Sequence, residues 1–359
     1  MKITGISYRQ YQWPRRKPIR NGMFTYTDVT LSVVEIETDA GLVGLGLGGV
    51  NSSLLERFKP LLIGEDPLNV ERLWHALWVP KLVGRRGTET RTISSLDIAL
   101  WDLIGRATDK SVHQLLGGYA ERIPVYIAGG YYEEGKGLKE LAEEMEENLR
   151  MGAKAVKMKI GGAPIGEDVE RVRVVRETVG PDVAVMVDAN NAYPAHEAIR
   201  IAAQMEKYDI YWFEEPVGAD DYAGCARVAQ ATSIPIATGE NEYTRYGFRD
   251  LIQHQAASIL NADANICGGV TEFRRIAALA AAHDLVIAPH GSQDIHIHLV
   301  TGIPNGLILE YYRDTVDPMW GKTFEETLTL DADGMLAPPD RPGFGITLNE
   351  EALAKYRVS

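Results

Sequence analysis

Three acidic residues each follow a short apolar run. Asp188 ends the run AVMVD, Glu214 ends the run IYWFE, and Glu240 follows the run IATG. Three carboxylates that converge on one point repel one another unless they are protonated or neutralised. A divalent cation would neutralise them, and a ligand set made only of oxygen atoms favours Mg²⁺ over zinc. Taken singly, each acid could be only the cap of a following helix. Taken together, they predict a Mg²⁺ site.

Two lysines, Lys157 and Lys159, lie in the apolar run AVKMKI. Side chains two residues apart on a strand point to the same side, so both ammonium groups should face one site. Repulsion between them, and a nearby metal, should lower their pKa values, and a lysine that loses its proton can act as a base. A pair of surface lysines is the alternative, which the flanking apolar residues disfavour.

A histidine and two further acids complete the set. His290 ends the run VIAPH, and Asp263 follows the preceding apolar run, so the two should be neighbours. A carboxylate on one imidazole nitrogen fixes the tautomer and raises the basicity of the other nitrogen, which predicts a catalytic dyad. Bases on opposite sides, Lys159 and His290, suit removal of a proton next to a carboxylate. Mg²⁺, Lys157 and a protonated Glu310 could stabilise the resulting enediolate.

The elements that must position these residues alternate strictly between strand and helix patterns from residue 123 onward. Strand patterns begin near Val125, Ala155, Ala184, Tyr211, Pro235, Ser258, Val286 and Gly306. Amphipathic segments separate most of them: 138–150, 167–178, 195–207, 222–231, 245–254 and 270–283. Eight strands joined by helices predict a (β/α)₈ TIM-type barrel, with the site at the C-terminal ends of its strands. An open doubly wound sheet is disfavoured because no G-x-G-x-x-G follows a first strand.

The rest of the chain predicts a second unit. Residues 3–8, 30–36 and 43–46 read as half-buried antiparallel strands, and residues 93–104 as a helix with one apolar face. The basic stretch 14–20 is expected to be a loop, either simply solvated or a lid that supplies cations to an acidic ligand. We therefore expect an α+β capping domain over residues 1–120, a barrel over 121–315, and a segment over 316–359 that returns to the capping domain.

Composition excludes several classes of protein. The 359 residues have a formal net charge of −13, which argues against a nucleic-acid surface. Only Cys225 and Cys267 are present, too few for a disulfide framework. The first residues show no signal-peptide pattern, and no apolar run reaches the length of a membrane span. We expect a cytoplasmic protein that binds a small carboxylate and has no nucleic-acid or membrane partner.

The motifs resemble those of the enolase superfamily and, within it, the mandelate racemase and muconate lactonizing enzyme family, over nearly the whole chain. The motifs are KMK at 157–159, VDAN at 187–190, WFEEP at 212–216, GE at 239–240, Asp263 five residues before GGV, His290, Glu310, and the helix pattern SLDIALWD at 95–102.

The resemblance, to the mandelate racemase subgroup, implies a Mg²⁺-dependent dehydratase of an aldonic or aldaric acid that yields a 2-keto-3-deoxy acid. Its implied metal ligands are Asp188, Glu214 and Glu240. Lys159 would be one base, and His290, paired with Asp263, would be the acid or base opposite. Implied contacts to the substrate come from Lys157, Asn190 and Glu310, and for distal groups from Arg20, Tyr26, Tyr131, Tyr132 and Arg245. Capping-domain loops, comprising residues 15–28 and part of residues 51–58, would select the substrate. A homo-oligomer is also implied.

Other functions remain open at this stage. A racemase or epimerase of a 2-hydroxy acid, or a sugar-lactone cycloisomerase, would need the same two bases. A zinc hydrolase using His296 and His298 is a weaker alternative, because the acids indicate a hard cation. A non-catalytic barrel protein is equally weak, since none of the expected catalytic residues is missing.

Overall fold

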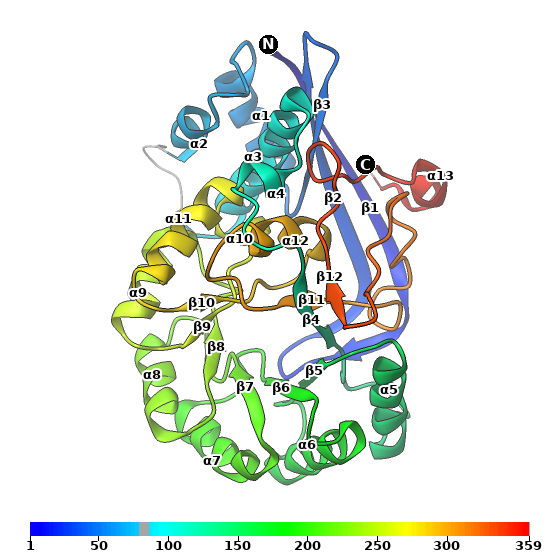
Figure 1. Cartoon of the computed structure of the whole chain (residues 1–359), viewed down its shortest axis with the longest axis vertical. Helices are drawn as coiled ribbons and strands as arrows, with labels where there is room; N and C mark the ends of the chain where they lie inside the picture. The colour runs from blue at the N-terminus through cyan, green and yellow to red at the C-terminus, as the bar shows by residue number, and fades with distance from the viewer. Residues whose placement is uncertain (79–85, 359) are drawn as a thin grey trace.

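The computed structural model describes residues 1–78 and 86–358, which form an N-terminal sheet covered by helices, a barrel, and a C-terminal segment that lies along both (Figure 1). The N-terminal sheet has the antiparallel order β1-β2-β3. Its elements, with the helices that follow, are β1 (Ile3–Arg20), β2 (Thr25–Thr38), β3 (Val43–Leu47), α1 (Ser52–Leu62), α2 (Val70–Trp78), α3 (Thr88–Thr108) and α4 (Val112–Leu115).

Two glycines of β3 allow α3 to pack directly on the sheet. A Cβ atom at Gly44 would clash with the carbonyl oxygen of Ala99, and one at Gly46 would clash with that of Ser95. The helix therefore approaches the strand more closely than any side chain would permit. The predicted helix over residues 93–104 is confirmed as part of α3, and Ile93, Leu96 and Leu100 of its apolar face are buried.

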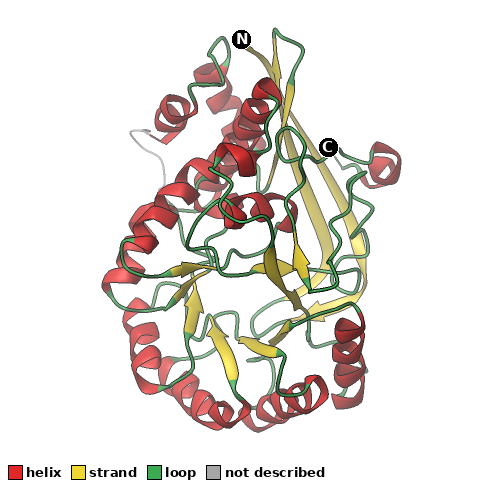
Figure 2. Cartoon of the chain, in the orientation of Figure 1, coloured by secondary structure: helices red, strands yellow, loops and turns green. Residues whose placement is uncertain are grey.

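The barrel consists of eight parallel strands surrounded by helices (Figure 2). Its strands are β4 (Ile123–Ala128), β5 (Ala155–Lys159), β6 (Ala184–Asp188), β7 (Ile210–Glu214), β8 (Ile236–Thr238), β9 (Ile259–Leu260), β10 (Val286–Ile287) and β11 (Leu309–Tyr311). The helices are α5 (Leu138–Arg150), α6 (Ile165–Val179), α7 (Ala195–Met205), η1 (Glu206–Tyr208), α8 (Tyr222–Ala231), α9 (Thr244–Gln253), α10 (Ala264–Cys267), α11 (Gly269–Ala281) and α12 (Gln293–Thr301).

The ring of strands closes between β10 and the residues just before β11. The backbone N–H of Ile287 donates to the carbonyl of Asn305 at 2.9 Å, and the N–H of Leu307 donates to the carbonyl of Ile287 at 2.8 Å. Tyr126, Met186 and Trp212 belong to the buried cluster that fills the interior. The predicted (β/α)₈ barrel with a separate N-terminal sheet unit is confirmed.

The C-terminal segment contains β12 (Met335–Leu336), α13 (Glu350–Leu353) and η2 (Ala354–Tyr356). β12 pairs antiparallel with β4 of the barrel. Further along, the N–H of Val358 donates to the carbonyl of Gln10 in β1 at 2.8 Å. The segment thus contacts both other parts of the chain, and we retain the predicted boundaries at residues 120 and 315 as a proposal.

Two predictions about the N-terminal region are wrong. The stretch 14–20 is not a free loop, because it lies within β1 and carries a register shift between Pro14 and Ile19. Proline has no N–H for the ladder, so the strand bulges there and resumes pairing with β2 further on. Part of residues 51–58 was also expected to be a loop, but residues 52–58 are helical. They begin α1, which the Asn51 side chain caps by accepting from the N–H of Leu54. No helix among residues 1–78 and 86–358 has the length and apolarity to span a membrane.

Candidate active site

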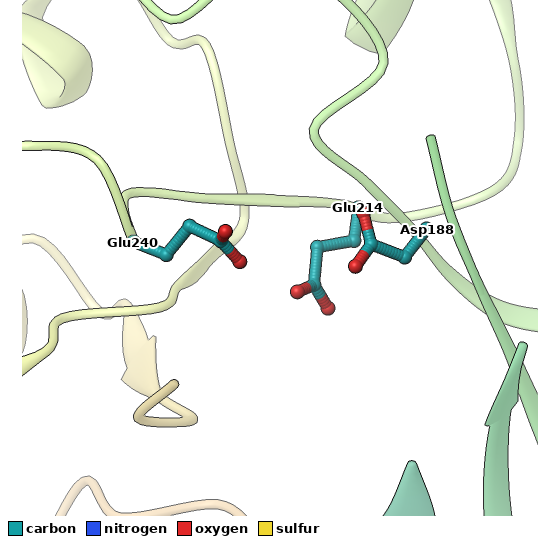
Figure 3. A group of neighbouring side chains, drawn as sticks. All are labelled: Asp188, Glu214 and Glu240. Atoms are coloured by element: carbon teal, nitrogen blue, oxygen red, sulfur yellow. The ribbon is translucent and has the colours of Figure 1, made fainter. Parts of the chain in front are cut away.

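Three carboxylates meet at the mouth of the barrel. Asp188 and Glu214 are the last residues of β6 and β7, and Glu240 lies two residues after β8. Their side chains point toward one common space, with one carboxylate oxygen of each within 4.8 Å of the others (Figure 3). Gly239 has a φ of +126°, and a Cβ there would lie 2.8 Å from the Phe248 ring, so the turn that directs Glu240 inward requires glycine.

The donor set fits Mg²⁺. All three groups are buried carboxylates, and the Oε2 atom of Glu240 has no hydrogen-bond partner among residues 1–78 and 86–358. The oxygens of Asp188 and Glu214 are held in place by donors. The N–H of Asn190 donates to Asp188 at 2.8 Å, and the indole N–H of Trp212 donates to Glu214 at 2.9 Å. A buried carboxylate oxygen without a partner is costly, and a hard cation would satisfy it.

Both lysines of β5 lie against these carboxylates. The Nζ atom of Lys157 is 2.7 Å from Glu214 and 2.8 Å from Glu310, and the Nζ of Lys159 is 2.5 Å from Asp188. Burial lowers the pKa of each lysine, but the adjacent carboxylates raise it further, so both pKa values are above their ordinary value. The predicted lowering by mutual repulsion is wrong, because each ammonium group pairs with a carboxylate, whereas the predicted lowering by a nearby metal stays a prediction.

Glu310 is also a charged partner rather than a neutral acid. It belongs to β11 and is fully buried, and its Oε2 accepts from the N–H of Gly291 at 2.7 Å. Burial raises its pKa, but Lys157, His290 and Lys159 lower it more, so the pKa of Glu310 is below its ordinary value. The predicted protonated Glu310 is therefore wrong, because Lys157 stabilises its ionised form.

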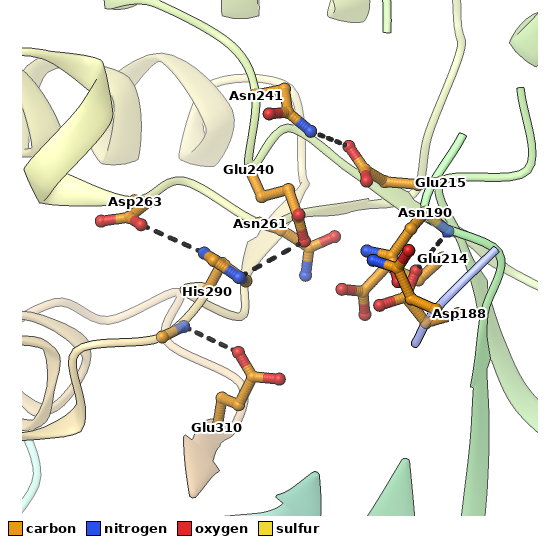
Figure 4. Close-up of polar contacts among 12 residues, drawn as sticks. Asp188, Asn190, Glu214, Glu215, Glu240, Asn241, Asn261, Asp263, His290 and Glu310 are labelled. Atoms are coloured by element: carbon orange, nitrogen blue, oxygen red, sulfur yellow. Dashed lines mark hydrogen bonds and ion pairs between the residues drawn. The ribbon is translucent and has the colours of Figure 1, made fainter. Parts of the chain in front are cut away.

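The predicted pair of His290 and Asp263 is present. The Nδ1 of His290 lies 3.1 Å from Oδ2 of Asp263, and its Nε2 lies 3.7 Å from Glu240 (Figure 4). Burial lowers the pKa of His290, but Glu240 and Asp263 raise it well above the ordinary value. Glu215, the residue after Glu214, points away from the three carboxylates of the metal site. Its side chain accepts a hydrogen bond from the Asn241 amide at 2.8 Å.

A cavity of about 460 Å³ joins the two expected bases. Lys159, Asn190, Glu240 and His290 all line it, as do Tyr26 and Tyr131, which were expected near distal substrate groups. Lys157, Asp188, Glu214 and Glu310 are fully or almost fully buried beneath this surface. The cavity therefore lies between the two tyrosines and a densely packed group of charged side chains.

Three expected distal ligands have other partners. Arg20 donates to the carbonyl of Gly162 at 2.8 Å and lies 4.7 Å from the centre of the Tyr132 ring. Tyr132 itself donates to Asp168, and Arg245 pairs with Glu272 at 2.7 Å. We therefore do not retain Arg20, Tyr132 or Arg245 as substrate ligands.

Sequence reasoning missed several residues that line the cavity. Gln293 and Tyr312 lie beside the charged centre, and Trp320 and Phe324 come from the C-terminal segment. The C-terminal segment has no helix or strand periodicity, so no local pattern in the sequence marks Trp320 and Phe324.

Two matches cover most of the chain. Residues 3–117 match the family described as mandelate racemase / muconate lactonizing enzyme, N-terminal domain, and residues 140–352 match the family described as enolase C-terminal domain-like. The chain belongs to the mandelate racemase and muconate lactonizing enzyme family.

Other proteins of known activity are similar to this family member over most of their length. This chain is 35% identical to arabinonate dehydratase of Saccharolobus solfataricus, and the match covers 90% of this chain and 89% of the relative. It is 34% identical to 3,6-anhydro-alpha-L-galactonate cycloisomerase of Streptomyces coelicolor, covering 92% of each. The crystal structure of a racemase from Streptomyces coelicolor with bound magnesium matches 99% of the chain and 100% of that chain, with a TM-score of 0.91 and 31% identity.

The protein is therefore an enzyme of the enolase superfamily, and Mg²⁺ is its cofactor. The contacts of His296 and His298 exclude the alternative that the protein is a zinc hydrolase. The ring of His296 contacts the backbone of Ala264 and Gly291, and that of His298 contacts the backbone of His113 and Phe344. Their ring nitrogens are thus occupied by the protein itself.

Proposed function

We propose that this enzyme is an acid-sugar dehydratase. It would remove the proton next to the carboxylate of an aldonic or aldaric acid and eliminate the β-hydroxyl group as water, yielding a 2-keto-3-deoxy acid. The observation that carries the proposal is the single cavity lined by both Lys159 and His290. Two proton-transfer groups of different chemistry can thus reach neighbouring carbons of one substrate.

The residues divide the reaction between two sides of the cavity. Lys159, in its uncharged form, takes the α-proton, and Lys157 contributes positive charge beside the substrate carboxylate. His290 gives a proton to the departing β-hydroxyl, and Asp263 at 3.1 Å keeps its ring oriented. Mg²⁺ held by Asp188, Glu214 and Glu240 would supply further positive charge at that carboxylate. The enol product then tautomerises to the keto acid.

Four further residues have supporting roles in the proposal. Glu310 pairs with Lys157 and holds the backbone of Gly291, so it supports both sides of the site. Asn190, Tyr26 and Tyr131 line the cavity and offer hydrogen bonds to hydroxyl groups of the substrate. The Oδ1 of Asn190 is buried and has no hydrogen-bond partner in the described part of the chain, which suits a hydroxyl donor from the substrate.

A cycloisomerase or a racemase would use the same two residues. The cycloisomerase is favoured as the second candidate by the 34% identity to 3,6-anhydro-alpha-L-galactonate cycloisomerase. In that reaction the α-proton would be handled similarly, but no water would leave. Product chemistry, rather than residue identity, therefore separates the candidates.

The test is incubation with Mg²⁺ and a set of aldonic and aldaric acids and their lactones in D₂O, followed by NMR. A new 2-keto-3-deoxy signal is the expected result and names the substrate. Deuterium at the α-carbon without a keto product would replace the dehydratase by a racemase or epimerase. Consumption of a lactone or anhydro sugar without loss of water would favour the cycloisomerase.

A further inference from the structure

Two histidines of α12 take no part in the proposed reaction, although both are fully buried. His298 lies toward the N-terminal part of the chain. Its Nδ1 is 3.2 Å from the backbone nitrogen of His113, and its Nε2 is 3.0 Å from the carbonyl oxygen of Phe344. His296 lies instead behind the pair formed by His290 and Asp263. The two histidines are therefore buried on the same helix but contact different parts of the chain.

The ring of His296 contacts the residues that directly follow the two members of the pair. Its Nδ1 is 2.6 Å from the carbonyl oxygen of Gly291, which follows His290. Its Nε2 is 2.9 Å from the backbone nitrogen of Ala264, which follows Asp263. A carbonyl can only accept and a backbone N–H can only donate, so the ring carries its hydrogen on Nδ1. The neutral ring thereby joins the ends of β9 and β10.

Other contacts hold the same two loops. The N–H of Gly291 donates to Glu310 at 2.7 Å, so both polar groups bordering this glycine are bonded. The side-chain amide of Asn265 contacts Asp263 at 3.1 Å and Ser292 at 2.5 Å. By contrast, the His290 ring has a hydrogen bond to protein only at Nδ1 among the described contacts. The direction of that ring therefore depends on how the backbone after His290 is held.

We propose that His296 is a positioning residue that sets the distance and angle between Asp263 and His290. The catalytic consequence rests on the proposed function, whereas the geometric consequence does not. Loss of the bridge removes one of the contacts that hold the backbone after His290, and a small displacement of a proton-transfer group can cost about 100-fold in rate. Lys159 lies across the cavity on β5 and makes no contact with this bridge among the described residues. Proton removal by Lys159 is therefore preserved.

Two conservative variants separate the halves of the bridge. In His296→Asn the shorter amide can still donate to Gly291 but does not reach Ala264. In His296→Gln the longer amide can still accept from Ala264 but does not satisfy Gly291. His298→Asn is the matched control, because it replaces a buried histidine two residues away on the same helix with the same side chain.

The experiment records ¹⁵N NMR spectra of the histidine rings in uniformly labelled protein with Mg²⁺. The chain has 8 histidines, so the signals must be assigned. A His290→Asn sample assigns the His290 signal. We expect both His296 variants to shift that signal away from its bonded Nδ1–H form, while His298→Asn leaves it unchanged. With a substrate in D₂O, product formation should fall on the order of 10- to 100-fold while α-deuterium exchange stays within about twofold.

Unchanged His290 signals in both His296 variants would overturn the proposal. Equal effects of His296→Asn and His298→Asn would also overturn it, because they would indicate a general loss of packing. A shifted signal in an enzyme that dehydrates no acid sugar would leave the positioning role standing and reject the proposed function. The NMR and the turnover assay therefore fail independently.

Discussion

Both lysines at the barrel mouth lie against carboxylates. Lys157 bridges Glu214 and Glu310, and Lys159 contacts Asp188, so the buried charges are paired rather than isolated. Removing one partner would leave the other charge buried without compensation, which is strongly destabilising. At the scale of residues, the same carboxylates thus serve the lysines and the metal.

Lys159→Ala tests the base assignment. The variant should lose α-proton exchange by about 10²- to 10⁴-fold, the usual contribution of a positioned general base. Deuterium incorporation by NMR measures it, with circular dichroism to verify folding. Lys154→Ala is the control, since this exposed lysine precedes the same strand. Exchange at the normal rate in Lys159→Ala would reject the assignment.

Glu240→Gln tests the metal site. Mg²⁺ should raise the thermal unfolding temperature of the unaltered enzyme, because a ligand that binds only the folded state stabilises it. In Glu240→Gln the Mg²⁺ affinity should fall at least about 10-fold, which calorimetric titration measures. Glu242→Gln is the control, because Glu242 contacts Tyr222 and Tyr243 instead. Equal Mg²⁺ affinity in the two variants would contradict the site.

At the scale of elements, short strands place the site and two helices lock the N-terminal unit onto the barrel. Asp97 of α3 accepts from the N–H of Thr271 in α11 at 2.8 Å and from its hydroxyl at 2.6 Å. A Cβ at Gly269 would clash with the same carboxylate, so the start of α11 fits closely around Asp97. This buried contact joins the two units.

Asp97→Asn should change how stability depends on pH. Burial raises the pKa of Asp97 from 3.8 to about 7, so between those values the folded chain binds a proton that the unfolded chain does not. The contribution of Asp97 to stability therefore falls as pH rises through that window. Asparagine does not titrate, so the variant does not lose stability in this way as the pH rises.

The free energy of unfolding of Asp97→Asn, relative to the unaltered protein, should therefore increase by about 1.4 kcal/mol per pH unit across the window. Urea unfolding at several pH values measures it. Asp109→Asn, at the exposed C-cap of the same helix, is the control and should follow the unaltered protein. Parallel pH curves for Asp97→Asn and the unaltered protein would show that Asp97 does not titrate there.

At the scale of the whole molecule, the cavity is shared by all three parts of the chain. Trp13 comes from β1, His290 from the barrel, and Trp320 from the C-terminal segment. Trp13 also donates to Asp317 at 2.8 Å, which ties the segment to the sheet beside the cavity. Substrate choice therefore depends on how three distant segments pack.

Asp102→Ala tests that packing. The buried carboxylate of Asp102 accepts from the backbone N–H of Leu45 in β3 at 2.9 Å, from that of Phe344 in the C-terminal segment at 2.9 Å, and from Arg106 at 2.6 Å. Alanine leaves these donors unsatisfied, so the free energy of unfolding should fall by about 2–4 kcal/mol in urea titrations. The exposed Asp340→Ala should change it by less than about 0.5 kcal/mol. Similar losses in both variants would contradict the role of Asp102.

The sequence by itself determined the barrel and the membership of its charged centre. Alternation of strand and helix depends on local periodicity, and parallel strands bring their C-terminal ends to one rim, so Asp188, Glu214 and Glu240 had to meet. Tertiary structure alone decided the bulge after Pro14, the partners of Arg20, and the ionised state of Glu310. Each of these depends on groups far away in the chain, and neither strand pairing nor the balance of burial against a neighbouring charge can be read from local residue order.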